Sequence, residues 1–183
     1  VYNSLLRTAQ KQEKAVFLLL DNMGALDASI AIGSFRKFLP YWSSPVLDKE
    51  ETGIQMKDLY HPLIENPVAN SLDMKGPVLL TGSNASGKST FLKTVAVNAI
   101  LAQTLGTCTA SYYQAPYVKI LTSMALKDNL QGGESYFIVE IKSLKRILDE
   151  SRKGEPLLCI VDEVLRGTNT IERVAASSGI LRY

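Results

Sequence analysis

Cysteine and histidine are scarce in this chain of 183 residues. It has two cysteines, Cys108 and Cys159, and one histidine, His61. The cysteines lie far apart in the sequence, with no Cys-x-x-Cys pair and no mixed cluster of cysteine and histidine around them. This pattern argues against a disulfide framework and against a zinc site. We therefore expect two reduced thiols in a cytoplasmic protein.

Long apolar runs and a strong net charge are also absent from the sequence. The longest apolar run is AVFLLL at 15–20, well short of the ~18 residues that a membrane-spanning helix needs. The sequence therefore predicts no membrane segment. The net charge of +2 is too small to indicate a nucleic-acid or anionic membrane surface by itself. The hydrophobic share of 46% fits a globular domain with a real core.

The pattern of apolar residues along the chain changes once, and this change divides the sequence into two parts. Residues 1–39 carry apolar side chains at spacings of three and four, which predicts a helix that ends before Pro40. We assign 1–52 to a helical segment with a linker. We assign 53–183 to an α/β domain with a mostly parallel sheet flanked by helices. The chain begins without methionine and stops inside a helical pattern, so we expect it to be part of a longer protein.

Within the second part, strand and helix patterns alternate. One predicted helix, at 135–151, has Phe137, Ile141, Leu144 and Leu148 on its apolar face. The other predicted elements are a buried strand at 77–81, a helix at 88–106 ended by Gly106, a strand within 117–124, a strand at 156–163 buried on both faces, and a helix from 170 capped by Asn169.

A glycine-rich loop follows the first of these strands. GSNASGKS, at 82–89, matches the pattern G-x-x-x-x-G-K-[ST]. Gly82 and Gly87 let backbone N–H groups turn toward an anion, Lys88 can reach the β- and γ-phosphates, and Ser89 can offer a hydroxyl to Mg²⁺. The alternative is a glycine-rich turn with an incidental lysine and serine, but the predicted strand and helix supply the context of a phosphate site. The predicted nucleotide-binding residues are Gly82, Ser83, Asn84, Ala85, Ser86, Gly87, Lys88, Ser89 and Thr90.

Two acids end the strand at 156–163. Asp162 is placed to hold Mg²⁺ through its carboxylate, and Glu163 is placed to act as the general base that polarises a water molecule. A solvated strand end is the alternative for an Asp–Glu pair taken alone. The phosphate-binding loop upstream favours the hydrolytic interpretation.

Three segments together resemble one family: TGSNASGKSTFLK, DNLQGGESYFIVEI and LLCIVDEVLRGTNTIER. They are similar to the ATPase domain of the MutS family of DNA mismatch-repair proteins, a branch of the ABC-type P-loop ATPases. The resemblance covers most of 59–183, and 1–39 resembles the end of the lever and core region that precedes that domain. It implies a Mg²⁺-dependent ATPase that couples ATP and ADP binding to DNA clamping through dimerisation, with DNA held by domains outside this chain.

The resemblance also implies roles for single residues. Lys88, Glu163 and Ser135 would form the catalytic set, with Ser135 meeting the γ-phosphate bound by the partner subunit. Asn84 would touch the phosphates. The segment 166–169 would line the dimer interface. Ser89 and Asp162 would be the Mg²⁺ ligands.

Departures from the family pattern leave alternatives open. Val68 stands where many relatives have an aromatic residue that stacks on adenine, and NASG at 84–87 replaces the commoner NMGG. The family's C-terminal dimerisation segment would lie beyond Tyr183, so we expect weak or no ATPase activity from this chain alone. The alternatives are a MutS-like paralogue acting on other DNA structures, an ABC-type ATPase outside DNA repair, and a nucleotide-dependent module that does not hydrolyse. An ABC-type ATPase would carry an LSGGQ-like signature where this chain has LQGGES.

Overall fold

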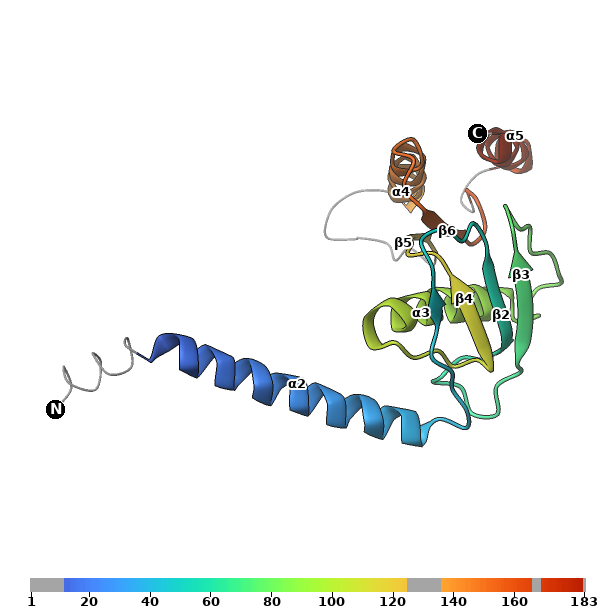
Figure 1. Ribbon diagram of the computed structural model, residues 1–183. Helices are drawn as coiled ribbons and strands as arrows, with labels where there is room; N and C mark the ends of the chain where they lie inside the picture. The colour runs from blue at the N-terminus through green and yellow to red at the C-terminus, as the bar shows by residue number, and fades with distance from the viewer. Residues whose placement is uncertain (1–11, 125–135, 166–168, 183) are drawn as a thin grey trace. The chain divides into compact units, whose positions relative to one another are not determined.

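The computed structural model describes residues 12–124, 136–165 and 169–182 (Figure 1). The chain divides into two units, residues 1–41 and 42–183. Ser135 and residues 166–168, to which the sequence assigned roles in a dimer, lie outside the described residues.

The first unit contains the helix α2 (Glu13–Phe38), in agreement with the predicted helix. It ends where Leu39, which precedes a proline, adopts an extended backbone with ψ of 141°. By length and composition alone α2 could cross a membrane, since its most apolar window has a mean hydropathy of 1.6. This is weak evidence, because Asp21 and Asp27 lie within the helix and each would cost about 3 kcal/mol at the centre of a bilayer.

The second unit contains two sheets. The four-stranded sheet has the order β1-β4-β2-β3, in which β1 and β4 are parallel while β2 is antiparallel to both β3 and β4. The two-stranded sheet pairs β5 and β6 in parallel. The bounds of the strands are β1 Val46–Leu47, β2 Ile54–Leu59, β3 Asn70–Met74, β4 Tyr112–Ala115, β5 Lys119–Ser123 and β6 Leu157–Val161.

The unit is a mixed α/β structure, as predicted, but the prediction of a mostly parallel sheet is wrong. The larger sheet is mixed, and β2 and β3 lie before the first strand that the sequence predicted, at 77–81. The connection between β2 and β3 spans residues 60–69, which is too short for the helical crossover that a parallel pair requires. An antiparallel arrangement follows from that length.

The strand predicted at 77–81 is not formed. Its backbone is irregular, and Val78, Leu79 and Leu80 are 50%, 74% and 37% exposed. The strand β6 is also less enclosed than predicted: Leu158 and Ile160 are buried, whereas Cys159 is exposed. In the described part of the chain β5 is the only strand paired with β6, and Cys159 lies on the opposite face of β6 from the buried Leu158 and Ile160.

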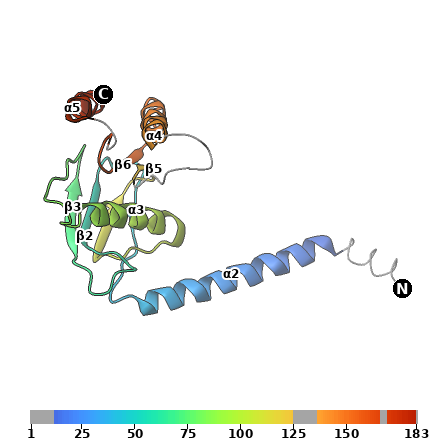
Figure 2. The same cartoon turned by 180° about the vertical axis from the view of Figure 1, so that it is seen from behind.

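Helix α3 (Lys88–Leu105) lies across one face of the four-stranded sheet, in front of it in Figure 2. Small residues on its inner face, Ala96, Ala99 and Ala102, are buried and allow a close approach to the strands. The core of the unit joins this face to side chains of β2 and β4, including Met56 and Tyr113. The helix ends at Gly106, as predicted, with φ of 57°.

A buried polar network fixes α3 to the neighbouring segments. The side-chain N–H group of Asn98 donates to Thr109 Oγ1 at 2.9 Å, and Asn98 Oδ1 accepts the Thr109 backbone N–H at 2.7 Å. The Thr109 hydroxyl donates in turn to the Tyr60 carbonyl at 2.6 Å. Asn98 and Thr109 are fully buried, so these bonds replace water for every group involved.

Helices α4 (Tyr136–Ser151) and α5 (Thr170–Arg182) complete the unit, and α4 packs on β5 and β6. The predicted apolar face of α4 is partly wrong. Ile141 is 38% exposed, while Glu140, Leu144 and Ile147 are buried. The buried face of α4 is therefore shifted by one position from the predicted apolar face, and it includes the carboxylate of Glu140.

Candidate functional site

The glycine-rich loop leads directly into α3, which begins at Lys88 as predicted. Gly87 caps the helix with φ of 88°, a conformation that side chains rarely adopt. The Ser86 N–H donates to the Ser83 carbonyl at 3.3 Å, which closes the loop into a turn. Gly82 lies under this turn, because a Cβ atom there would come within 2.9 Å of Ser86 Oγ. The backbone angle therefore favours glycine at Gly87, whereas a side chain at Gly82 would require the Ser86 hydroxyl to rotate away.

The ammonium group of Lys88 bridges the two ends of the loop. Its Nζ atom donates to the Gly82 carbonyl at 2.8 Å and to the Ser83 carbonyl at 2.6 Å. A positive charge therefore lies over a helix N-terminus, which is itself electropositive. An anion entering the loop can take the place of these carbonyls as the partner of the ammonium group.

The NASG departure has a structural correlate at Ala85. Its φ is 61°, so a residue with a side chain occupies the left-handed region, at a cost of about 1–2 kcal/mol. The next residue, Ser86, packs its hydroxyl against Gly82. The variant loop thus contains local strain and one additional hydroxyl group.

A cavity of about 420 Å³ opens at the loop. It is lined by Asn84, Ala85, Ser86, Gly87, Lys88, Ser89, Thr90 and Glu163. The structure therefore brings the predicted general base to the predicted phosphate site from a distant part of the sequence. Asp162 is not among the described residues that line this cavity, and its N–H instead donates to the Ser123 carbonyl at 3.0 Å, beyond the last pair of the β5–β6 ladder.

The turn after β6 has an unusual backbone. Glu163 and Leu165 have φ of 54° and 50°, although neither is glycine. Two side chains hold this turn: the Leu165 N–H donates to Glu140 Oε1, and Arg173 Nε donates to the Val164 carbonyl at 3.4 Å. Sequence reasoning missed both Glu140 and Arg173. The spacing of Glu140 with Leu144 and Ile147 was the available signal.

A second cavity, of about 580 Å³, adjoins the loop on its other side. It shares Ser86, Gly87, Lys88 and Thr90 with the first cavity. The rest of its lining is largely aliphatic and amide in character, including Leu80, Asn66 and Val68, together with His61 and Phe91. Val68 is 81% exposed and lies at the cavity surface.

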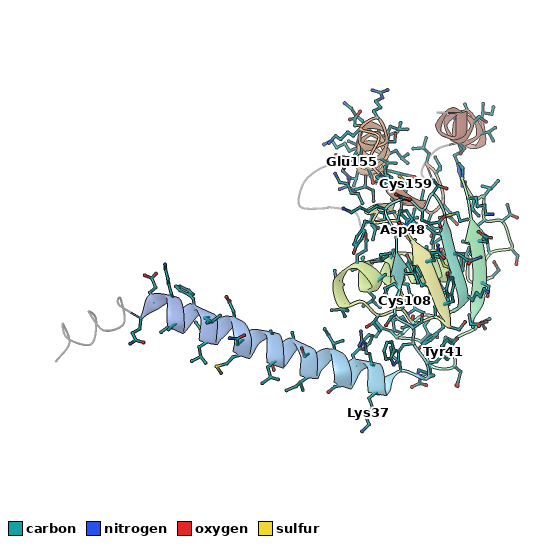
Figure 3. The ribbon with its side chains drawn as sticks, viewed as in Figure 1. Lys37, Tyr41, Asp48, Cys108, Glu155 and Cys159 are labelled. Carbon is teal, nitrogen blue, oxygen red and sulfur yellow. The ribbon has the colours of Figure 1, made fainter. Side chains whose placement is uncertain are left out.

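Neither cysteine is activated for nucleophilic chemistry. Burial raises the pKa of the Cys108 thiol to about 12 and raises that of Cys159 as well. Figure 3 marks Cys108 at the level of α3 and the four-stranded sheet, and Cys159 on β6. The described part of the chain also holds no cluster of three or more histidine, cysteine or acidic side chains suited to a metal ion.

The fold and the site together define a class: mixed α/β domains in which a glycine-rich loop opens a helix and an acidic turn faces that loop. A family profile described as MutS domain V matches residues 78–183, which is more than half of the chain. The chain belongs to the MutS family. This confirms the family identified from the three sequence motifs.

Individual relatives agree with this assignment. The DNA mismatch repair protein MutS of Leptospira interrogans is 32% identical over 195 aligned positions, covering 100% of this chain and 22% of that protein. The DNA mismatch repair protein MSH3 of Vanderwaltozyma polyspora is 32% identical over 174 positions, covering 90% of this chain and 17% of that protein. The DNA mismatch repair protein MutS of a Thermotoga strain is 30% identical over 188 positions, covering 98% of this chain and 23% of that protein. The chain spans about a fifth of the length of these relatives.

Proposed function

We propose that this chain is the ATP-binding and ATP-hydrolysing domain of a MutS-family protein, and that it couples nucleotide state to DNA clamping through dimerisation. The observation that carries the proposal is the cavity in which the loop at 82–90 and Glu163 converge. The relatives named as DNA mismatch repair proteins support the biological setting. DNA contacts belong to parts of the protein outside this chain.

In this proposal the loop binds the triphosphate. Backbone N–H groups between Gly82 and Ser89, apart from the Ser86 N–H that bonds to Ser83, would donate to the phosphates, and Lys88 would leave the Gly82 and Ser83 carbonyls to pair with the β- and γ-phosphates. Ser89, which lines the loop cavity, and Asp162, which is not among the described residues of its lining, would supply the hard oxygen donors that Mg²⁺ prefers. Bound Mg²⁺ would neutralise charge on the phosphate oxygens.

Glu163 is the proposed general base. Glu163 lines the same cavity as the loop, so its carboxylate could hold a water molecule against a γ-phosphate bound there. Asp162 follows the last residue of β6, where the ladder with β5 fixes its backbone. The backbone of Asp162 is held by β5, whereas Glu163 lines the loop cavity. This difference suits metal binding by Asp162 and proton transfer by Glu163.

The larger cavity is the proposed site of the nucleobase. Its aliphatic lining near Val68 offers no stacking surface at that position, and its aromatic rings among the described residues are those of Phe91 and His61. Contacts of this kind distinguish poorly between purines, since apolar surface is not selective for hydrogen-bonding edges. We therefore expect ATP to be preferred only modestly over GTP.

The remaining assignments extend beyond the described residues. Ser135 of one subunit would meet the γ-phosphate held by the other, and residues 166–169 would line the contact between them. The boundary at residue 53 and a cytoplasmic location also remain predictions. A MutS-like paralogue acting on other DNA structures is the second candidate, favoured by the strained Ala85 and the aliphatic Val68 in the nucleotide site.

Nucleotide binding by this chain tests the site. Lys88→Ala is expected to abolish Mg-nucleotide binding in calorimetry, because it removes the cation above the loop. Lys93→Ala is the matched control, as Lys93 is an exposed lysine further along the same helix. Equal affinity of the wild type and Lys88→Ala would overturn the site assignment.

Turnover tests the proposed base. In the full-length protein that contains this chain, Glu163→Ala is expected to remove ATP hydrolysis while nucleotide still binds, because the variant loses the proton acceptor and keeps the loop. Persistent turnover in this variant would exclude Glu163 as the base.

A further inference from the structure

Glu140 is a buried carboxylate without a cationic partner among the described residues. Its side chain is 3% exposed in the middle of α4. Oε1 accepts the backbone N–H of Leu165, while Oε2 has no hydrogen-bond partner in the described part of the chain. Glutamate is rarely buried in this way, and a buried polar atom without a partner requires an explanation.

The partner of Glu140 is the turn that carries Glu163. Three hydrogen bonds between described residues help to attach this turn: the Asp162 N–H donates to the Ser123 carbonyl of β5, Arg173 of α5 donates to the Val164 carbonyl, and the Leu165 N–H donates to Glu140 of α4. Positive φ at two non-glycine residues persists only where the surrounding structure imposes it. These attachments impose it, and they come from three different elements.

We infer that Glu140 is a positioning residue for hydrolysis, which holds the 163–165 turn in its left-handed conformation and thereby keeps Glu163 at the loop cavity. Arg173 assists from the opposite side of the turn. This inference rests on the proposed function, because it assumes that Glu163 acts as the base. Glu140 itself is not among the described residues that line the loop cavity.

Loss of the acceptor would release the turn. The Leu165 N–H would lose its hydrogen bond to Glu140 Oε1, and the backbone would gain free energy by moving to negative φ. Glu163 directly precedes this region, so its carboxylate would shift relative to the loop. The loop, Lys88 and the larger cavity would stay in place, so the expected defect is in turnover and not in nucleotide affinity.

Three variants of Glu140 and a control test this in the full-length protein that contains the chain. Glu140→Gln keeps an acceptor oxygen, whereas Glu140→Met keeps the size and removes the acceptor. We expect Glu140→Met to lower kcat on the order of 10- to 100-fold, as a misplacement of about 1 Å does, with KM and the Kd of a fluorescent ATP analogue within about twofold of wild type. Glu140→Gln should restore most of kcat, and Glu140→Ala should behave like Glu140→Met.

Glu150→Gln is the matched control, since it removes a carboxylate from the same helix at an exposed ion pair. Its kcat should equal that of the wild type. A wild-type kcat in Glu140→Met, or a Glu140→Gln variant as slow as Glu140→Met, would overturn the inference. If Glu140→Met does not fold, Arg173→Met decides: a lowered kcat at unchanged Kd supports the inference, and an unchanged kcat overturns it.

The proposed function can fail separately. If the wild-type protein binds nucleotide but does not hydrolyse it, the hydrolytic function is wrong, and the role of Glu140 is wrong with it. If the wild type hydrolyses ATP and Glu140→Met does so equally well, only the role of Glu140 is wrong.

Discussion

The buried network around Asn98 gives the sharpest prediction about stability. Asn98→Ala removes the acceptor of the Thr109 N–H, which lies 2.7 Å from Asn98 Oδ1 in a fully buried position. An unsatisfied buried N–H costs about 1–3 kcal/mol, and the small cavity left by the side chain adds about 1 kcal/mol. The Tyr60 carbonyl keeps the Thr109 hydroxyl as its donor, so it adds little. The expected loss in the free energy of unfolding is about 2–4 kcal/mol.

Urea denaturation measures this loss. The single tryptophan, Trp42, lies in the same unit as Asn98, so its fluorescence and the far-UV circular dichroism both report on unfolding. With a urea dependence of about 2 kcal/mol per molar, the midpoint should fall by about 1–2 M. Thr104→Ala is the control, because the Thr104 hydroxyl is exposed and bonds only within α3, to the Ile100 carbonyl; it should change stability by no more than about 0.5 kcal/mol.

A double-mutant cycle sharpens the test. Thr109→Val removes the hydroxyl that links Asn98 to Tyr60, so its effect should overlap with that of Asn98→Ala. The two losses should differ from additivity by about 0.5–3 kcal/mol, as for residues in one hydrogen-bond network. Additive losses, or an Asn98→Ala midpoint equal to that of Thr104→Ala, would refute the reasoning that this network anchors α3.

Two further predictions concern the loop and the end of α4. Gly87→Ala should destabilise the chain by about 1–2 kcal/mol, because φ is 88° at that position. Gly76→Ala is the control and should leave the stability unchanged, because Gly76 lies in open space and has no positive φ. Thermal unfolding of the two variants measures the difference. Hydrogen bonds from Lys119 and Lys153 lower the pKa of Glu150 from 4.5 to about 2. The folded-state pKa is depressed, so this stabilisation is present above pH 4.5 and is lost as the pH falls toward 2. Stability measured across that window should vary less with pH in Glu150→Gln than in wild type, and equal slopes would contradict the assignment.

Local features of the site could be predicted from the sequence. The start of α3 at Lys88 depends on Gly87 and on the residues that follow it, and the end of α3 depends on Gly106; these are signals that neighbouring residues carry. The helices α2, α4 and α5 lie where the sequence predicted helices, and α2 ends before Pro40. The pairing of loop and acidic turn was predicted because each motif has its own chemistry. The family followed from the combination of motifs, and the profile match confirms it.

The tertiary structure decided the rest. The direction of β2 and β3, the open edge of β6 and the irregular backbone at 77–81 depend on which strands find partners, and no local pattern fixes that. The buried face of α4 likewise depends on what lies opposite. From the sequence, Ile141 is expected on the buried face of α4 and Glu140 on the solvent-exposed face. In the folded chain the Leu165 N–H donates to the Glu140 carboxylate, so Glu140 is buried and Ile141 is exposed. The sequence by itself predicts a chemistry for the loop and for the acids, because those residue types act through their own groups. Only the folded chain determined how the turn that carries Glu163 is held, because that depends on hydrogen bonds between distant segments.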